Sequence, residues 1–483
     1  MPQKMRMTLT CLVLAVALVA ASVSSLTLQT VAVIHRHGAR TPMPSVNASA
    51  LCPGGAAGCG ILTLQGKQML TNLGRYLRHH YNQTIEPYSF YNPDVVHTQS
   101  TDVDRTIQSA DALLRGLYEH LEGTPEMVYP VVNTRDISRE TELLVWDGWP
   151  ALVMWSAATD SQFFPMLSND LLQNVVNASV LAAVGEEIGL NEECNPTLPT
   201  FFPFQCAIDA QDMYSAAITT GTTGKFPVTG QFYPNLVEAL VTYNEYAMGK
   251  FDEETNDGKF LAAVGSFGYP LALALLSHLA DGGRSLTHYS GHDITLIPLY
   301  NALGNFTMLN PRFGAAMIFE SWQPDDSSPV FIVAKSGEPG QTPESNFTYT
   351  FQNFSLTCMT ASGAVYHSLS GCPIGDLRRY VSSRAPQSPR GICYTSDSTQ
   401  LALNCTAGDS APPETYCSYY RGMCLDACGD DGAMTADLLC VPIPSSTVRA
   451  PPKKPGGPKQ PTRQHYGSTQ HGAKRSVDRH RRG

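Results

Sequence analysis

Apolar residues near the start of the chain switch between strand-like and helix-like spacing. Residues 27–35 (TLQTVAVIH) are rich in β-branched side chains and predict a buried strand. Residues 62–81 then place apolar side chains on one helical stripe, and a second amphipathic helix follows a short strand candidate at 94–98. Strands that alternate with helices predict an α/β fold, with a doubly wound, mainly parallel sheet flanked by helices.

The middle of the chain has a different pattern. Residues 135–265 indicate helices and long loops, and they hold three of the four tryptophans. We expect a mostly helical cap subdomain here, inserted into an α/β core of residues 26–134 and 266–395. In the second part of the core the strand–helix pattern returns, with strands near 316–319 and 330–334.

The first 25 residues resemble a targeting segment. Lys4 and Arg6 precede an apolar stretch over 9–21, and small residues follow through Ser25. This order predicts a cleavable signal peptide over 1–25. The apolar stretch is short for a bilayer, which needs about 20 residues, and a retained signal anchor is the alternative. We therefore expect the chain in the secretory pathway: secreted, at the cell surface or in a lysosome-like compartment.

Cysteine content agrees with that compartment. Twelve cysteines remain once Cys11 leaves with the signal, which predicts up to six disulfides of open connectivity. Most of the late ones fall in residues 396–440, a cysteine-rich extension. Their spacing and the oxidising route disfavour a zinc site, so no metal is expected there. The following sequons predict glycosylation: Asn47, Asn82, Asn177, Asn305, Asn346, Asn353 and Asn404.

Charge is distributed unevenly along the chain. The net charge is −10, yet the segment from Arg449 onward carries ten Lys or Arg against one acid, which leaves −19 on the remainder. An acidic body would repel a phosphate backbone, so we expect no nucleic acid as partner. Residues 441–483 are rich in Pro, Gly, Lys and Arg and predict a disordered basic tail. Its sequence holds no apolar stretch long enough for a membrane span, so none is expected after signal cleavage.

Directly after the first predicted strand the chain reads RHGARTP, in which Arg36 and Arg40 flank His37. Functional residues of open α/β sheets gather beyond the carboxyl ends of the strands. Two arginines beside a histidine would repel its protonated form unless an anion lies between them. Guanidinium groups suit phosphate oxygens, and a neutral imidazole nitrogen can attack phosphorus. The motif therefore predicts phosphate chemistry at His37.

Two further strand–helix junctions carry matching groups. Arg105 lies in TDVDR, after the short strand and at the start of a helix, which would direct it toward the same edge of the sheet. His292 and Asp293 follow a strand-like stretch and precede a helix-like one. The second histidine can bind phosphate, and the carboxylic acid can donate a proton. Together the three junctions form a phosphoryl-transfer constellation that includes no metal or cofactor.

At these motifs the chain resembles the histidine acid phosphatases, the lysosomal and prostatic type of the histidine phosphatase superfamily. RHGARTP matches the family's RHGxRxP signature, His292-Asp293 its distal HD pair, and the segment around Arg105 its middle arginine motif. The similarity covers roughly residues 26–395, and it is greatest to the acid phosphatases of trypanosomatid protozoa.

The resemblance implies a role for each residue. His37 would take the phosphoryl group as a phosphohistidine, and Asp293 would protonate the leaving oxygen. The groups that would hold the phosphate oxygens are Arg36, Arg40, Arg105 and His292. We expect small phosphorylated substrates and a bell-shaped pH profile with its maximum below neutrality. Oligomeric state stays open, a homodimer being one option.

Several alternatives remain open. A phytase, a lysophospholipid phosphatase or a mutase would share the fold, although mutases lack a signal and a phytase would want a strongly basic pocket. A non-catalytic secreted glycoprotein on a retired scaffold is the alternative from another class. Asp293 could instead cap a helix. For four other histidines, a structural role is the favoured interpretation: His35, His79, His80 and His97.

Overall fold

The computed structural model describes residues 26–43, 52, 58–85, 91–124, 130–137, 140–144, 169–245, 266–323 and 329–385, and the backbone of 432–434 and 440–442. The expected signal peptide and, beyond Pro442, the basic tail lie outside these residues. So do three tryptophans of the predicted cap and nearly all of the cysteine-rich extension. Within that extension, β11 (Gly432–Met434) pairs antiparallel with β12 (Cys440–Pro442).

An eight-stranded sheet forms the centre of the described residues, in the order β10-β6-β5-β1-β4-β2-β3, with β7 beside β6. The four strands from β1 to β3 run parallel, and the strands on the other side of β1 pair antiparallel. The strands are β1 (Thr27–Arg36), β2 (Val96–Thr101), β3 (Asn133–Arg135), β4 (Leu286–Gly291), β5 (Ala316–Gln323), β6 (Phe331–Pro339), β7 (Tyr349–Asn353) and β10 (Cys372–Pro373). A hairpin of β8 (Leu356–Met359) and β9 (Val365–Ser368) lies outside this sheet.

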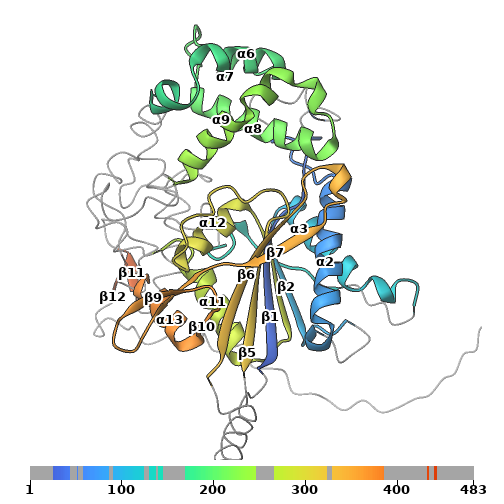
Figure 1. Cartoon of the computed structure of the whole chain (residues 1–483), viewed down its shortest axis with the longest axis vertical. Helices are drawn as coiled ribbons and strands as arrows, with labels where there is room; N and C mark the ends of the chain where they lie inside the picture. Colours follow the sequence, from blue (N-terminus) through green and yellow to red (C-terminus); the bar gives the residue numbers. More distant parts are fainter. Residues whose placement is uncertain are drawn as a thin grey trace, which may run out of the picture. The chain divides into compact units, whose positions relative to one another are not determined.

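Helices cover both faces of the sheet, as Figure 1 shows. Because side chains alternate along a strand, β1 sends Val31 and Val33 into one core and Ala32 and Ile34 into the other. The first core is closed by α2 (Leu64–Ile85) and α3 (Asp104–Leu117). The second is closed by α11 (Tyr269–Asp281), α12 (Asp293–Ala302) and α13 (Ile374–Ser383). The predicted α/β fold with flanking helices is confirmed.

The described part of the predicted cap is helical. It contains α6 (Ala178–Ile188), α7 (Asn191–Cys194), α8 (Pro203–Thr220) and α9 (Pro227–Asn244), which share a hydrophobic core of their own. Figure 1 shows these helices grouped beyond one end of the sheet. A disulfide between Cys194 and Cys206 joins α7 to α8. The cap and the sheet belong to one compact unit, which places helix side chains in front of the strand ends.

Disulfides are present as the cysteine count predicted. Beside Cys194–Cys206 the structure forms Cys52–Cys59 and Cys358–Cys372. The side chains of the other six cysteines of the mature chain lie outside the described residues. A search of the described helices for one long and apolar enough to cross a bilayer found none.

Candidate active site

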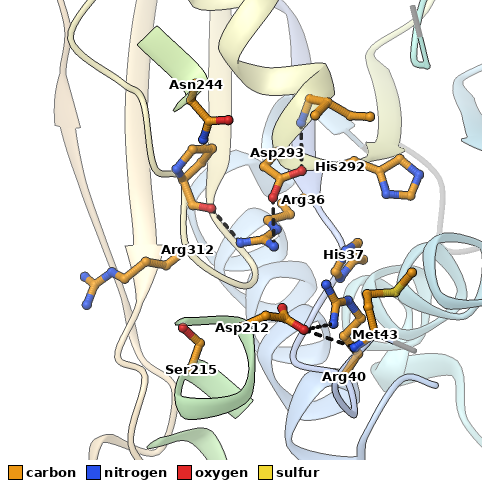
Figure 2. Close-up of polar contacts among 12 residues, drawn as sticks. Arg36, His37, Arg40, Met43, Asp212, Ser215, Asn244, His292, Asp293 and Arg312 are labelled. Carbon is orange, nitrogen blue, oxygen red and sulfur yellow. Dashed lines mark hydrogen bonds and ion pairs between the residues drawn. The ribbon is translucent and has the colours of Figure 1, made fainter. Parts of the chain in front are cut away.

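Three neighbouring parallel strands bring the predicted site residues to one edge of the sheet. β4 lies between β1 and β2, with Arg36 opposite Gly291 in the register. His37 follows β1, His292 follows β4, and Arg105 lies at the start of the helix after β2. The rings of His37 and His292 meet edge to face, with centroids 5.5 Å apart and planes 74° apart. Figure 2 shows Arg36, Arg40 and Asp293 gathered around the same point.

Close backbone packing holds the loop after β1 in place. The His37 N–H donates to the Gly291 carbonyl at 2.9 Å, and the His37 carbonyl accepts from the Gly314 N–H at 3.0 Å. A Cβ on Gly38 would lie 2.2 Å from the Gly66 carbonyl oxygen, so only glycine lets α2 approach this closely. The loop that carries His37 is therefore fixed from three sides by backbone contacts.

His37 is buried, and its hydrogen bonding defines its tautomer. Its Nδ1 lies 2.9 Å from the Gly38 carbonyl oxygen, and because a carbonyl only accepts, Nδ1 carries the proton. Nε2 is then left with a free lone pair. Burial, followed by the charges of Arg36 and Arg105, holds the pKa of His37 well below its usual value. The ring therefore stays neutral, and Nε2 stays nucleophilic, in acidic solution.

Three guanidinium groups surround this ring and lack part of their hydrogen bonding. The buried Nε atoms of Arg36, Arg40 and Arg105 have no hydrogen-bond partner in the described structure. Burial and mutual repulsion lower the pKa of Arg36, and they lower that of Arg105 to about 10. The ring of Phe313 supports Arg36, whose Cζ lies 4.7 Å from the ring centroid. Buried donors that lack partners and repel one another are suited to an oxyanion.

Asp293 pairs with the first of these arginines. Its Oδ2 lies 2.9 Å from Arg36 Nη2, and Arg36 Nη1 donates to the Pro311 carbonyl at 2.8 Å. Burial is the largest single cause and acts to raise the pKa of Asp293, but the charge of Arg36, the neighbouring His292 and Arg40 and the bond from the Ile294 N–H together outweigh burial, and the net shift is downward. Asp293 is the first residue of α12, after the N-cap His292, and its Oδ1 accepts from the Ile294 N–H at 2.9 Å, so its carboxylate also binds a backbone donor at the start of this helix.

His292 is fixed by several partners. Its Nδ1 accepts from the backbone of Thr295 and lies 3.4 Å from Arg105 Nη2, so its proton is on Nε2, which donates to Thr101 Oγ1 at 3.0 Å. Burial and the neighbouring Arg105 lower the pKa of His292 to about 3. The ring is therefore neutral, and it positions Arg105 beside His37.

One member of the site was missed by the sequence analysis. Asp212, on the cap helix α8, accepts from Arg40 Nη1 at 2.8 Å and from the Met43 N–H at 3.0 Å (Figure 2). A single aspartate on a cap helix carries no motif, so only the folded chain could reveal this contact. The cap thereby joins the catalytic loop, and between them lies a cleft of about 630 Å³.

A second unpredicted feature lies beneath the site. His35 and His288 are fully buried, and their Nε2 atoms are 2.8 Å apart. His35 Nδ1 donates to the Arg36 carbonyl at 2.9 Å, and His288 Nδ1 lies 3.2 Å from Thr98 Oγ1. A continuous chain of hydrogen bonds thus links β1, β4 and β2 below the loop that carries His37. The complete burial and the hydrogen bonds of His35 agree with the structural role that the sequence analysis favoured for it.

Comparison with known proteins agrees with this geometry. The family model of the histidine phosphatase superfamily (branch 2) matches residues 27–154. Human testicular acid phosphatase is 27% identical over 307 residues, an alignment that covers 60% of this chain and 66% of the relative. Lysosomal acid phosphatase of Rattus norvegicus is 25% identical over 62% of this chain and 69% of its own length. Lysophosphatidic acid phosphatase type 6 of Mus musculus is 25% identical over 56% and 60%. The alignment thus leaves about a third or more of each relative unmatched.

Solved structures share the fold. The phytase of Klebsiella sp ASR1 superposes with a TM-score of 0.54 at 13% identity, over 77% of this chain and 99% of the phytase. Hafnia alvei phytase in complex with tartrate gives a TM-score of 0.54 at 15% identity, over 78% and 99%. The closer similarity to trypanosomatid enzymes stays a prediction. The RHGARTP motif lies within the matched residues 27–154, so this part of the chain is similar to branch 2 of the histidine phosphatase superfamily, and the described structure shares the fold of these phytases.

Proposed function

We propose that this protein is an acid phosphatase that hydrolyses phosphate monoesters through a phosphohistidine on His37. One observation carries the proposal: the lone pair of a neutral, buried imidazole lies among three guanidinium groups whose Nε donors have no partner in the described structure. A phosphate group would satisfy those donors and bring its phosphorus to His37 Nε2. Such charge stabilisation by fixed donors is the main source of rate in phosphoryl transfer.

The first half-reaction breaks the ester bond. Arg36, Arg40 and Arg105 hold the phosphate oxygens, and His292 joins them by exchanging its bond to Thr101 for a phosphate oxygen. Nε2 of His37 forms a bond to phosphorus as the bond to the leaving oxygen breaks. The imidazole keeps its Nδ1 proton, whose bond to the Gly38 carbonyl stabilises the positive charge that develops on the ring. The substrate enters as a monoanion whose proton passes to Asp293, and Asp293 gives this proton to the leaving oxygen.

The second half-reaction restores the enzyme. A water molecule enters where the alcohol left, and the Asp293 carboxylate accepts a proton from it as its oxygen bonds to phosphorus. The bond from phosphorus to Nε2 breaks, and inorganic phosphate is released. Asp293 can act in both steps because its carboxylate is held at the cleft by Arg36.

The proposal also covers the substrate class and the compartment. We propose small phosphorylated substrates and a location in the secretory pathway, whether secreted, at the cell surface or in a lysosome-like compartment. Three disulfides and the names of the lysosomal relatives support the pathway. In this proposal residues 1–25 are the signal peptide and 26–395 the phosphatase domain.

Trapping the intermediate tests the mechanism. The enzyme is mixed with a ³²P-labelled aryl phosphate, quenched, and digested under conditions that preserve acid-labile phosphohistidine. We expect the label on the peptide that contains His37, and none in the His37→Ala variant. His79→Ala, at an exposed histidine of α2, is the matched control and should label normally. Normal aryl phosphate hydrolysis by His37→Ala would refute the assignment.

A further inference from the structure

The cleft in front of the phosphate-binding arginines has two unlike walls. The sheet side presents Arg36, Arg40 and Asp293. The cap side is formed by one face of α8 and one face of α9, whose cleft-lining side chains recur at helical spacing and are half-buried. This wall carries four aliphatic side chains (Ile208, Ile218, Val237 and Leu240), two acids (Asp209 and Asp212) and four uncharged polar side chains (Gln205, Gln211, Ser215 and Tyr233).

The cap wall carries no positively charged side chain. Helices α8 and α9 contain neither Lys nor Arg, and the described cap, residues 169–245, holds Lys225 as its one basic residue against nine Asp or Glu. Arg312 also lines the cleft, but its Nε donates to Glu338 Oε2 at 2.6 Å and its backbone N–H to Glu338 Oε1 at 3.0 Å. Beyond the catalytic arginines, a second phosphate would therefore find no unpaired guanidinium among the described cleft residues.

The two acids on this wall are partly neutralised by their surroundings. Asp212 is paired with Arg40 at 2.8 Å. Asp209 lies near Glu193 of α7, and one carboxylate oxygen of each is buried without a donor in the described structure. Burial is the main cause that raises the pKa of Asp209 to about 7, and Glu193 adds to it. In acidic solution Asp209 is thus protonated, and the wall then offers a substrate aliphatic and uncharged polar side chains beside the Asp212–Arg40 ion pair.

We infer, resting on the proposed phosphatase function, that the cap wall is the leaving-group site for monophosphates with an uncharged, largely apolar body. An alkyl or aryl group would bury its carbon atoms against Leu240, Val237 and Ile218 while its single phosphate meets the arginines. The cleft of about 630 Å³ has room for both parts. A second phosphate on the body would face Asp212 and lose its hydration without gaining a cation, so the wall rejects polyphosphorylated substrates.

Three substrates test this inference: two share a six-carbon body and differ in their number of phosphates, and the third has a polar body. We would measure kcat/KM at pH 5 for hexyl phosphate, hexane-1,6-diyl bisphosphate and glycerol 2-phosphate. We expect hexyl phosphate to exceed each of the others by roughly tenfold or more, the range for a few methylenes in an apolar pocket. Equal values for hexyl phosphate and the bisphosphate would overturn the inference and leave the phosphatase function standing. Hydrolysis of none of the three would contradict the proposed function itself.

Variants connect the preference to the wall. Leu240→Asn should lower kcat/KM for hexyl phosphate about tenfold. The value of kcat/KM for glycerol 2-phosphate should stay within about twofold of that of the wild type. Leu198→Asn, the same change at an exposed cap residue outside the cleft, is the control and should alter neither. Val237→Lys adds a cation to the wall that can bind a second phosphate. It should therefore reduce the ratio of kcat/KM for hexyl phosphate to kcat/KM for the bisphosphate. If Leu240→Asn lowers kcat/KM equally for all three substrates, Leu240 has only a structural role, and the inference is wrong.

Discussion

Arg36 and Asp293 form an ion pair, 2.9 Å between Nη2 and Oδ2, which joins the end of β1 to the start of α12. The pair places the proposed proton donor on the same guanidinium that would hold the substrate phosphate. In the free protein the pair keeps the pKa of Asp293 low despite burial. A bound phosphate would compete for Arg36 and bring negative charge beside the carboxylate, and both effects favour the protonated acid.

The first prediction concerns pH. Asp293 is ionised in the free protein, so its proton must arrive with the substrate, as the monoanion of a phosphate monoester whose second pKa is about 6. We expect kcat/KM for an alkyl phosphate to fall above about pH 6. On the acid side His37 stays neutral, because its pKa lies well below 6.5, and activity should persist as pH drops through that value. A steady-state pH profile with its maximum above neutrality would contradict this mechanism.

The second prediction concerns the leaving group. Asp293→Asn keeps the shape of the side chain but removes the acid, so kcat for an alkyl phosphate should fall by roughly 10²–10⁴. An aryl phosphate needs little help from an acid, since its leaving oxygen is already stable as an anion, and it should lose much less. Asp102→Asn, at an exposed position before α3, is the control. Equal losses on alkyl and aryl phosphates would argue against proton donation by Asp293.

The third prediction concerns the packing of the catalytic loop. A Cβ on Gly66 would lie 2.1 Å from the Ala39 carbonyl oxygen, and backbone atoms cannot move aside cheaply. Gly66→Ala should therefore destabilise the fold by about 1–3 kcal/mol and lower kcat by displacing the loop that carries His37. Gly224→Ala is the matched control, because its added Cβ has no neighbour within 4 Å. Denaturant unfolding and steady-state kinetics measure both effects, and an unchanged Gly66→Ala enzyme would refute them.

The fourth prediction concerns stability in acid. Burial lowers the pKa of His35 to about 4 and that of His288 well below 6.5. The unfolded chain therefore binds more protons than the folded one below pH 6.5, and stability must fall as pH drops from 6.5 to 4. For His35 alone the loss is on the order of 3 kcal/mol across that window.

A double variant isolates this contribution. His35→Gln with His288→Gln removes both titrating rings and keeps polar groups in place, so unfolding free energies measured from pH 7 to 4 should slope less steeply than in the wild type. The exposed pair His79→Gln with His80→Gln is the matched control for replacing two histidines. Parallel curves for the wild type and the buried double variant would show that the buried pair does not titrate as described.

Much of the site could be predicted because its residues stand in contiguous motifs at strand–helix junctions. Arg36, His37 and Arg40 follow β1 directly, and His292 and Asp293 join β4 to α12. The predicted strand at 94–98 is β2 (Val96–Thr101), displaced toward Arg105. Local spacing was enough to place each group at a strand end, since parallel strands present their carboxyl ends at one edge.

The amino-acid sequence by itself determined the α/β fold, the presence of disulfides and the position of the candidate site residues at three strand–helix corners, because periodicity, short motifs and cysteine content act locally along the chain. Tertiary structure alone decided which distant groups meet. It pairs Asp212 of the cap with Arg40, places His288 against His35, and sets the aliphatic side chains of the cap opposite the arginines. It also decided the charge states, since burial and neighbouring guanidinium groups set the pKa of His37, and neither can be known before the chain is packed.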